Sequence, residues 1–353
     1  MASRLRGAAG DRRMTAPPFD LGALETYLRD REICRGPVTL RRIGDGHSNL
    51  TYLVDDGDRR VVLRRPPLPP IPPGGHDVVR EARIQRALAD TPVPVPTILT
   101  VEDGGPVMDA PFYVMDYLDG FVVTTRTPEP LDNPTDRLGL AEALVDTLAE
   151  LHRVDYRAVG LEDFGRPATN VERHLRRFSR IIDQEDQGLA GELGALLDWL
   201  VGDPPTPQPP TIVHGDFRLG NVMIAPGAPP RILAVLDWEL ATIGDPLRDL
   251  GYFLATYAVP GEPLHGITTL STATLEDGYP SRASLAERYA RSSGRGLSDI
   301  TWYVAMALWK LAVLFEYQCR RVAHGVGDEY YARPGLVDEL LSAARHVTTG
   351  ANV

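Results

Sequence analysis

The order of apolar and polar positions divides the chain into a strand-rich first part and a helical second part. Residues 19–33 carry apolar side chains at helical spacing. Short β-branched or aromatic runs then follow, separated by Gly/Asp turns, which is typical of an antiparallel sheet. These predicted strands begin at Val38–Arg42 and continue with Leu50–Val54, Arg60–Arg64 and Phe112–Tyr117. One predicted helix, over residues 76–90, interrupts the sheet.

From about Asp119 onward the pattern becomes helical. The predicted helices cover Leu138–Val154, Val171–Ile182 and Leu189–Val201, and the chain is expected to be helical again from about residue 238 to its end. A predicted β-hairpin precedes that last part, with strands at Asn221–Ile224 and Arg231–Asp237. The proline-rich stretches 65–75 and 91–100 indicate an exposed loop and an extended connector.

These elements predict an α+β fold with two lobes, which suits a chain of 353 residues. The expected parts are a flexible leader (1–18), an N-terminal lobe (19–117) with a small antiparallel sheet, and a larger, mainly helical C-terminal lobe (118–348). The most apolar run, Trp302–Tyr317, contains Lys310 and Glu316 and is too short to span a bilayer comfortably. We therefore predict a buried helix there.

Composition narrows the classes of function. The formal net charge of −11 argues against sequence-independent nucleic-acid binding, which needs basic surface. Cys34 and Cys319 are the only cysteines and lack CxxC spacing, so neither a disulfide framework nor a zinc–cysteine site has support. The first residues contain arginines but no apolar segment of a secretory signal, and Met14 is a second candidate start. We expect a cytoplasmic protein that binds a small molecule, with no nucleic-acid or membrane partner.

Residues 213–221, Val-His-Gly-Asp-Phe-Arg-Leu-Gly-Asn, follow an apolar strand and place Asp216 and Asn221 with four residues between them. The hairpin that starts at Asn221 returns to Asp237. Mg²⁺ prefers hard oxygen ligands and leaves part of its shell to water and phosphate, so this set suits phosphoryl transfer. An ordinary turn that Asp216 and Asn221 cap is the alternative.

The segment resembles the catalytic and metal loops of the protein-kinase-like superfamily, and its His-Gly-Asp form is similar to aminoglycoside phosphotransferases. The resemblance extends from about residue 38 to about residue 320. It implies that Asp216 accepts the proton of the substrate hydroxyl, that Asn221 and Asp237 hold Mg²⁺, and that His214 is structural. It also implies that Asp249, in GDPLRDLGYFL, steadies the catalytic loop; a plain first-turn role in a helix is the alternative.

The same resemblance implies ATP binding in the N-terminal lobe. The turn Gly44–Asn49 would cover the phosphates, with Gly46, Ser48 and Asn49 facing them, although a Gly-rich hairpin without a ligand has the same pattern. The hinge between the lobes would read adenine. The residues implied there are Met115, Asp116, Tyr117 and Leu118.

Val61-Val62-Leu63-Arg64 matches the kinase strand pattern V-A-I-K, with arginine in the last place. The resemblance implies that Arg64 binds phosphate and that Glu81 is its partner. Arginine and lysine are not equivalent at such a site. A degenerate site and a solvated helix charge are the respective alternatives for Arg64 and Glu81. Because only one of the 37 basic residues is lysine, Arg64 fits a chain that uses arginine throughout.

Little chain follows Asp237 that could serve as an activation loop, so a small hydroxylated substrate is expected rather than a protein. The phrases VLRRPP, REARIQRAL and LDWELATIGDPLRDLGY resemble the kinase-like domains that accompany acyl-CoA dehydrogenases, which implies a hydroxyacyl-type substrate. The acidic net charge is also compatible with a cationic aminoglycoside. We predict an ATP- and Mg²⁺-dependent small-molecule O-phosphotransferase.

Three alternative functions fit the sequence less well. A catalytically weak nucleotide-binding pseudokinase or scaffold is the main alternative, because of Arg64 and the incomplete glycine turn. A metal-dependent hydrolase built on His214, Asp216 and Asp237 lacks further histidines at ligand spacing. A Walker-type NTPase is excluded because the sequence contains neither GKS nor GKT.

Overall fold

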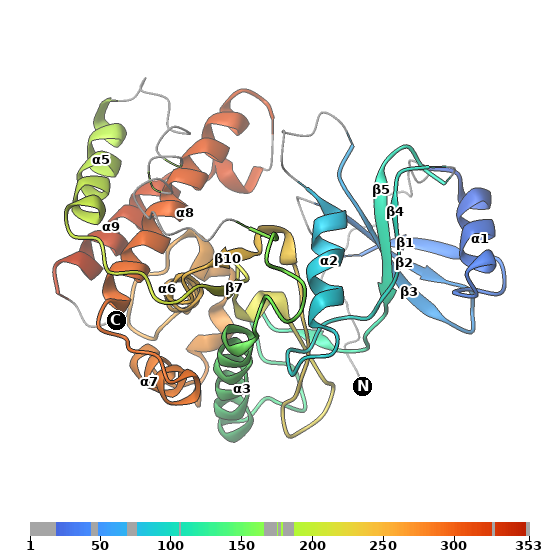
Figure 1. The fold of residues 1–353 in the computed structure, drawn as a ribbon. Helices are drawn as coiled ribbons and strands as arrows, with labels where there is room; N and C mark the ends of the chain where they lie inside the picture. The colour runs from blue at the N-terminus through green and yellow to red at the C-terminus, as the bar shows by residue number, and fades with distance from the viewer. Residues whose placement is uncertain are drawn as a thin grey trace. The chain divides into compact units, whose positions relative to one another are not determined.

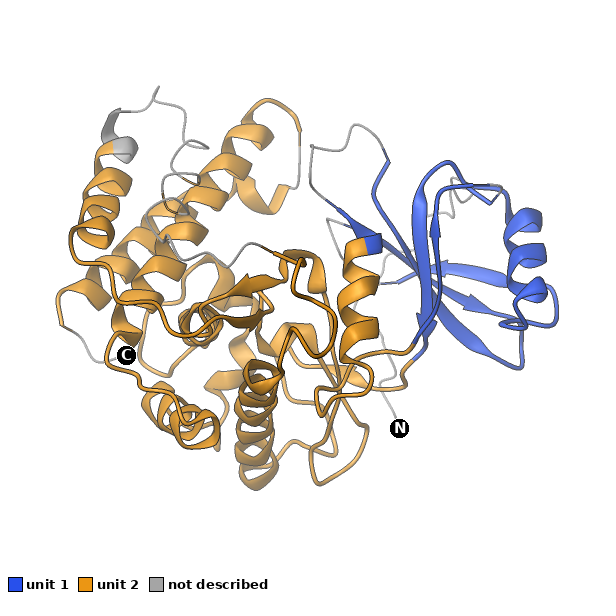
Figure 2. Cartoon of the chain, viewed as in Figure 1, with its two compact units in different colours: residues 1–79, 98–117 blue, residues 80–97, 118–353 orange. Residues whose placement is uncertain are grey.

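The computed structural model describes residues 19–43, 49–68, 76–105, 107–165, 175, 178, 187–326 and 329–350. They cluster into two compact units, coloured separately in Figure 2. Unit 1 comprises Met1–Val79 and Ile98–Tyr117, and unit 2 comprises Arg80–Thr97 and Leu118–Val353. Unit 1 thus ends at the residue where the N-terminal lobe was expected to end, while residues 80–97 cluster with unit 2.

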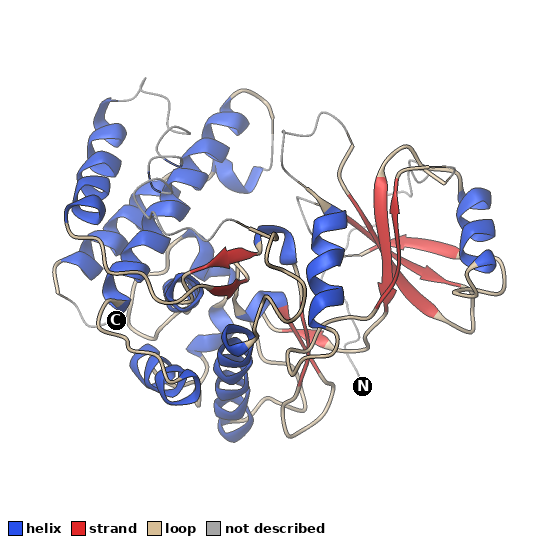
Figure 3. Cartoon of the chain, viewed as in Figure 1, coloured by secondary structure: helices blue, strands red, loops and turns tan. Residues whose placement is uncertain are grey.

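Unit 1 is a five-stranded antiparallel sheet with one helix, as Figures 1 and 3 show. In spatial order the strands are β1 (Thr39–Arg42), β2 (Leu50–Asp55), β3 (Arg60–Arg65), β5 (Pro111–Asp116) and β4 (Ile98–Asp103). Strand β4 was not predicted, since the prolines before it favoured an extended connector. Its residues pair with β5 across a register shift between Ile98 and Thr100.

The two faces of this sheet differ in what covers them. Helix α1 (Leu21–Asp30) starts at the Asp20 cap, whose Oδ1 accepts from the Gly22 N–H at 2.8 Å. Its buried leucines pack with one set of alternate strand residues, including Leu63 of β3 and Val114 of β5. Arg64 and Met115 belong to the other alternate set, and Met115 lies opposite Val62 in the ladder.

Unit 2 is mainly helical, with two small antiparallel sheets. Its helices are α2 (Val78–Leu88, from Arg80 onward), α3 (Pro134–Arg153), α5 (Gln187–Gly202), α6 (Leu247–Thr256), α7 (Arg282–Ser293), α8 (Ile300–Ala323) and α9 (Leu336–Thr348). One sheet pairs β7 (Thr211–Val213) with β10 (Thr242–Gly244), and the other has the order β6 (Phe121–Val122), β8 (Val222–Ile224), β9 (Ile232–Val235). Short 3₁₀ turns are η1 (Leu219–Asn221), η2 (Trp238–Leu240), η3 (Gly266–Leu270), η4 (Thr272–Leu275) and η5 (Glu329–Ala332).

The α+β class is confirmed, and so are most of the long helices. The predicted helix Val171–Ile182 lies outside the described residues apart from Leu175 and Phe178. Continuous helix after residue 238 was wrong, because the chain between α6 and α7 has only short 3₁₀ turns there. Helix α8 is longer than predicted, and by length and composition it could cross a membrane; most of its apolar stretch is buried inside unit 2, against α6 and α9.

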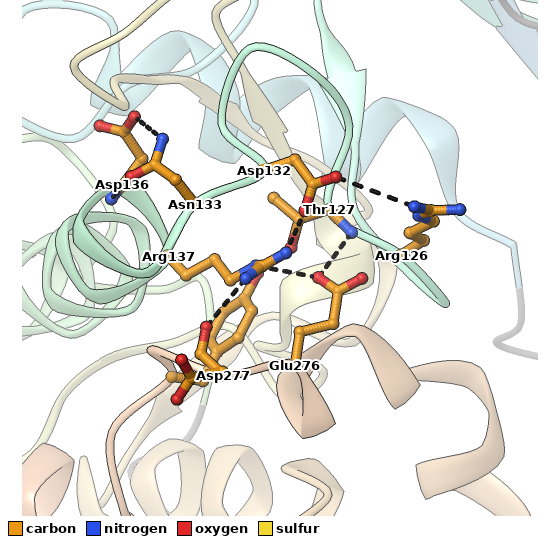
Figure 4. Close-up of polar contacts among 9 residues, drawn as sticks. Arg126, Thr127, Asp132, Asn133, Asp136, Arg137, Glu276 and Asp277 are labelled. Carbon is orange, nitrogen blue, oxygen red and sulfur yellow. Dashed lines mark hydrogen bonds and ion pairs between the residues drawn. The ribbon is translucent and has the colours of Figure 1, made fainter.

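A cluster of charged and polar side chains joins two distant segments of unit 2 (Figure 4). The Arg137 guanidinium donates to the Asp277 carbonyl at 2.9 Å and pairs with the Asp132 and Glu276 carboxylates. Glu276 Oε2 also accepts from the Thr127 N–H at 3.1 Å. The cluster therefore ties the loop before α3 to the chain that follows η4.

Candidate active site

The catalytic candidates lie on the loop that follows β7, and the turn η1 folds this loop back on itself. The Asn221 Nδ2 group donates to the Asp216 carbonyl oxygen at 2.8 Å and to Asp216 Oδ2 at 2.7 Å. The Asn221 N–H donates to the Arg218 carbonyl at 2.9 Å, which closes the turn. The spacing of four residues thus brings the carboxamide onto the carboxylate.

Gly215 is required by the path of the backbone here. Its φ is +86°, in the left-handed region, and a Cβ at this position would lie 2.7 Å from the Leu240 carbonyl oxygen. Only glycine adopts such a conformation without strain and also leaves room for this approach. Local sterics therefore require a glycine between the histidine and the aspartate of the His-Gly-Asp motif.

His214 is a structural residue of the loop. It is fully buried and packs against Trp238, with ring centroids 4.7 Å apart. Its Nε2 lies 2.9 Å from the Leu236 carbonyl and its Nδ1 accepts from the Asp216 N–H at 3.2 Å. Both ring nitrogens are therefore engaged, so the hydrolase reading, which needs His214 as a metal ligand, has no ring nitrogen to use.

Asp249, in the first turn of α6, holds the loop from beneath. Its carboxylate accepts from the His214 N–H at 2.6 Å and from the Gly215 N–H at 2.8 Å. His152 Nε2 lies 3.3 Å from the same carboxylate, and His152 Nδ1 lies 2.7 Å from the Tyr289 hydroxyl. Burial raises the pKa of Asp249, but the His152 and backbone hydrogen bonds outweigh it, so the pKa lies below its usual value. An ionised carboxylate therefore anchors the loop that carries Asp216.

The metal candidates Asn221 and Asp237 flank neighbouring strands: Asn221 ends η1 just before β8, and Asp237 lies two residues after the end of β9. The Leu236 N–H donates to the Asn221 carbonyl at 2.8 Å, and Asp237 is the next residue along the chain. Asp237 has φ 64° and ψ 62°, a left-handed conformation that a non-glycine residue adopts at a cost of about 1–3 kcal/mol and that clusters at functional sites.

This donor set fits Mg²⁺. Since Nδ2 of Asn221 is committed to Asp216, its Oδ1 is the atom that would face a cation. One carboxylate and one carboxamide are typical for an ion that keeps water and substrate phosphate in its shell. Among the described residues no group of three or more His, Cys, Asp or Glu side chains is arranged to hold a metal.

Three residues that interact electrostatically with Asp216 were not predicted as part of the site. Arg218 Nε lies 3.5 Å from Asp216 Oδ1, as an ion pair without hydrogen-bond geometry. The pKa of the Tyr252 hydroxyl on α6 is raised by burial and by the charge and hydrogen bond of Asp216. Lys310 on α8 feels the Asp216 charge as well. Arg218 stood in the motif itself, whereas Tyr252 and Lys310 arrive from distant helices and carry no local signal.

In unit 1, Arg64 lies at the position that the V-A-I-K pattern indicates. It is partly buried on β3, opposite Thr51, and its Nη1 lies 3.5 Å from the Thr51 hydroxyl. Burial and the Arg64 charge lower the pKa of His76, so the guanidinium acts on that ring. Asn49 is buried before β2, while Gly46 and Ser48 lie outside the described residues.

Two of the expected hinge residues, Asp116 and Tyr117, contact arginine side chains of unit 1. Asp116 Oδ1 accepts from Arg59 Nη2 at 3.2 Å, and the Arg60 guanidinium lies 4.3 Å from the centroid of the Tyr117 ring. A nucleotide would therefore meet backbone groups at Asp116 and Tyr117. Leu118 is the first residue of the second segment of unit 2.

Glu81 on α2 is only 2% exposed, so it is not a solvated helix charge. A buried carboxylate needs a hydrogen-bonded or charged partner. The pairing of Glu81 with Arg64 stays a prediction, because the two residues belong to different units.

The chain matches a known family of enzymes. The model of the phosphotransferase enzyme family (APH) matches residues 39–294. In the solved structures, a putative aminoglycoside phosphotransferase of Ralstonia eutropha JMP134 is 28% identical, with a TM-score of 0.78, and covers 95% of this chain and 100% of that one. An apo aminoglycoside phosphotransferase APH(4)-Ia is 17% identical, with a TM-score of 0.61, covering 93% and 100% of the two chains.

The chain therefore belongs to the phosphotransferase enzyme family, and its fold is the two-lobed, protein-kinase-like one predicted from the motifs. Among curated proteins it is similar to mouse acyl-CoA dehydrogenase family member 10, with 31% identity over 89% of this chain and 29% of the relative. Chicken acyl-CoA dehydrogenase family member 11 is 32% identical over 83% of this chain and 39% of the relative. The chain thus spans less than half the length of these relatives.

Proposed function

We propose that this phosphotransferase moves the γ-phosphoryl group of ATP to a hydroxyl of a small molecule in a Mg²⁺-dependent reaction. The observation that supports this most is the contact of Asn221 Nδ2 with Asp216 Oδ2 at 2.7 Å, with Asp237 directly after Leu236, whose N–H donates to the Asn221 carbonyl. A candidate base and two candidate metal ligands thus share one loop and one hairpin.

In this reaction Asp216 accepts the proton of the attacking hydroxyl. Its carboxylate is partly buried and is oriented by Asn221 on one oxygen and by Arg218 near the other. Asn221 and Asp237 would hold Mg²⁺, which neutralises charge on the transferred phosphoryl group when it is bound. Asp249 keeps the loop in place through two backbone N–H groups.

The nucleotide is assigned to unit 1. The turn with Gly46, Ser48 and Asn49 would cover the phosphates, and Arg64 would bind them as a bidentate cation supported by Glu81. The backbone of Met115–Leu118 would read the adenine ring. A solved relative of this fold holds the ATP analogue AMP-PNP together with hygromycin B, and another holds GDP and kanamycin.

For the acceptor we propose a hydroxyacyl-type molecule in the cytoplasm. The curated relatives of about 30% identity are acyl-CoA dehydrogenase family members. The solved complexes with aminoglycosides are at most 18% identical and support the fold alone. We prefer an acyl substrate to an antibiotic because the more similar relatives are named as acyl-CoA dehydrogenase family members.

The experiment is a screen of purified protein with Mg–ATP against hydroxylated metabolites, hydroxyacyl-CoAs and aminoglycosides, with mass-spectrometric detection of a phosphorylated product. The expected result is Mg²⁺-dependent phosphorylation in the hydroxyacyl group. Mg²⁺-dependent ATP binding with no product in any group would instead support the pseudokinase alternative, which the arginine at position 64 motivates.

A further inference from the structure

Helix α2 carries two arginines, Arg80 and Arg83, that bind the same loop of unit 2. They are three residues apart, so they lie on one face of the helix. The loop comprises residues 160–165 and follows α3. Figure 2 colours α2 from Arg80 onward with unit 2, to which this loop also belongs. The helix, the loop and the His-Gly-Asp motif are therefore parts of one compact unit.

Arg80 binds both the ring and the backbone of Phe164. Its Nη2 donates to the Phe164 carbonyl at 2.8 Å, and its Cζ lies 3.8 Å from the centroid of the Phe164 ring. That ring is 4% exposed and belongs to the same apolar core as Ile84 and Leu88 of α2. Stacking on a ring and donating to a neighbouring carbonyl requires the planar guanidinium, which lysine does not provide.

Arg83 holds the other end of the loop. Its Nη2 donates to the Gly160 carbonyl at 3.0 Å, and its guanidinium forms an ion pair with the Asp163 carboxylate. An exposed ion pair contributes little by itself. Here the same rigid guanidinium also binds a backbone carbonyl, which fixes its direction. The two arginines thus attach α2 to the loop at both Gly160 and Phe164.

The loop in turn lies against the strands that lead to the His-Gly-Asp motif. A Cβ on Gly165 would lie 2.5 Å from Thr242 Oγ1 and 3.0 Å from the Ile243 nitrogen, so the loop and β10 are in close contact. Strand β10 pairs with β7, and Thr242 lies opposite Val213, the last residue before the motif. A continuous set of contacts therefore runs from α2 through the loop and β10 to the catalytic candidates.

Glu81 stands between the two arginines in sequence and is 2% exposed. We propose that Arg80 and Arg83 are positioning residues, which fix α2 to the part of unit 2 that carries Asp216. The Glu81 carboxylate is thereby held in one place for its proposed partner Arg64. This inference rests on the proposed function for the task of Glu81. It makes α2 a fixed part of the catalytic unit rather than a helix that moves to switch the enzyme on.

Hydrogen–deuterium exchange of the full chain without ligand tests the attachment of the helix. The variant Arg80→Met/Arg83→Met keeps the apolar stems and removes both guanidinium groups. We expect the amides of α2 to exchange at least about 10-fold faster, while those of β7 and β10 keep their wild-type rates. Arg86 is exposed on the same helix, so Arg86→Met is the matched control and should exchange like the wild type. Unchanged exchange of α2, or equal acceleration of all three elements, would overturn the proposal.

Nucleotide binding tests the positioning of Glu81, which a purely structural role would not affect. The Kd of Mg–ADP is measured by calorimetry with and without Glu81→Gln. The double arginine variant should raise Kd about 10-fold when Glu81 is present and less than about twofold in the Glu81→Gln background, where no carboxylate is left to position. Equal factors in both backgrounds would overturn the proposal. A wild type that binds no Mg–ADP would contradict the proposed function, and the exchange rates would then decide the attachment of α2 alone.

Discussion

Asn221 is proposed to have two roles, and a single substitution can separate them from folding of the lobe. Its Nδ2 orients the Asp216 carboxylate, and its Oδ1 is the atom left for a cation. We predict that Asn221→Leu, which keeps the volume, lowers kcat at least about 100-fold and raises the Mg²⁺ concentration needed for half-maximal rate. Steady-state kinetics at varied Mg²⁺ check this, and an unchanged Mg²⁺ requirement would remove Asn221 from the metal site.

His265 makes stability depend on pH. Burial lowers its pKa from 6.5 to about 4. Between these pH values the unfolded chain therefore binds a proton at His265 and the folded chain does not. The resulting contribution to the free energy of unfolding is complete above pH 6.5 and is lost as the pH falls towards 4. It amounts to about 3 kcal/mol at most. We predict that His265→Gln flattens the fall in Tm between pH 6.5 and 4. A variant whose Tm falls as steeply as that of the wild type over this range would contradict the assignment.

At the scale of elements, the cluster in Figure 4 predicts unequal effects for two arginines. Arg137 is largely buried and bridges the segments before α3 and after η4, whereas Arg126 is 78% exposed and lies 3.8 Å from Asp132. Arg137→Ala should lower the free energy of unfolding by about 1–3 kcal/mol, because it leaves the partly buried Asp132 and Glu276 carboxylates without their cation and the Asp277 carbonyl without its donor. Arg126→Ala is the matched control and should stay within about 0.5 kcal/mol. Urea denaturation measures both, and equal losses would contradict the bridging role.

The sequence predicted those helices and strands whose apolar residues recur at regular spacing over a short stretch. Helix α3 and strands β3 and β5 appear where apolar spacing placed them. Strand β4 was missed because Pro94 and Pro96 dominate the segment before it, while its pairing with β5 is a long-range event. The irregular chain between α6 and α7 was missed because its apolar residues are buried by tertiary packing without a helical repeat.

The candidate site divides in the same way. The contact of Asn221 with Asp216 could be predicted, because a turn depends on residues that are close in sequence. Tyr252 and Lys310 could not, since they lie on helices far along the chain and act on Asp216 only through the fold, by hydrogen bond and charge for Tyr252 and by charge for Lys310. The roles of Asp216, Asn221, Asp237, Arg64 and the hinge all remain predictions, because they depend on bound nucleotide, metal and acceptor.

For the whole molecule, Mg–ATP should stabilise the folded chain by mass action, by about 2.7 kcal/mol at a concentration 100 times Kd. We predict that this rise in Tm disappears when EDTA removes Mg²⁺ and is largely lost in Asp237→Ala. The exposed acid Asp203 is a matched control, and Asp203→Ala should keep the full rise. If Asp237→Ala retained the wild-type rise, Asp237 would not be a metal ligand.

The central claim is that Asp216 is the base of a phosphotransferase. The most direct measurement is the rate of formation of the phosphorylated acceptor by wild type and Asp216→Asn at saturating Mg–ATP, with nucleotide Kd measured for both. The account predicts product from wild type, a rate lower by about 10²–10⁴ in the variant, and nucleotide Kd values within twofold of each other. Equal rates for the two proteins would contradict it.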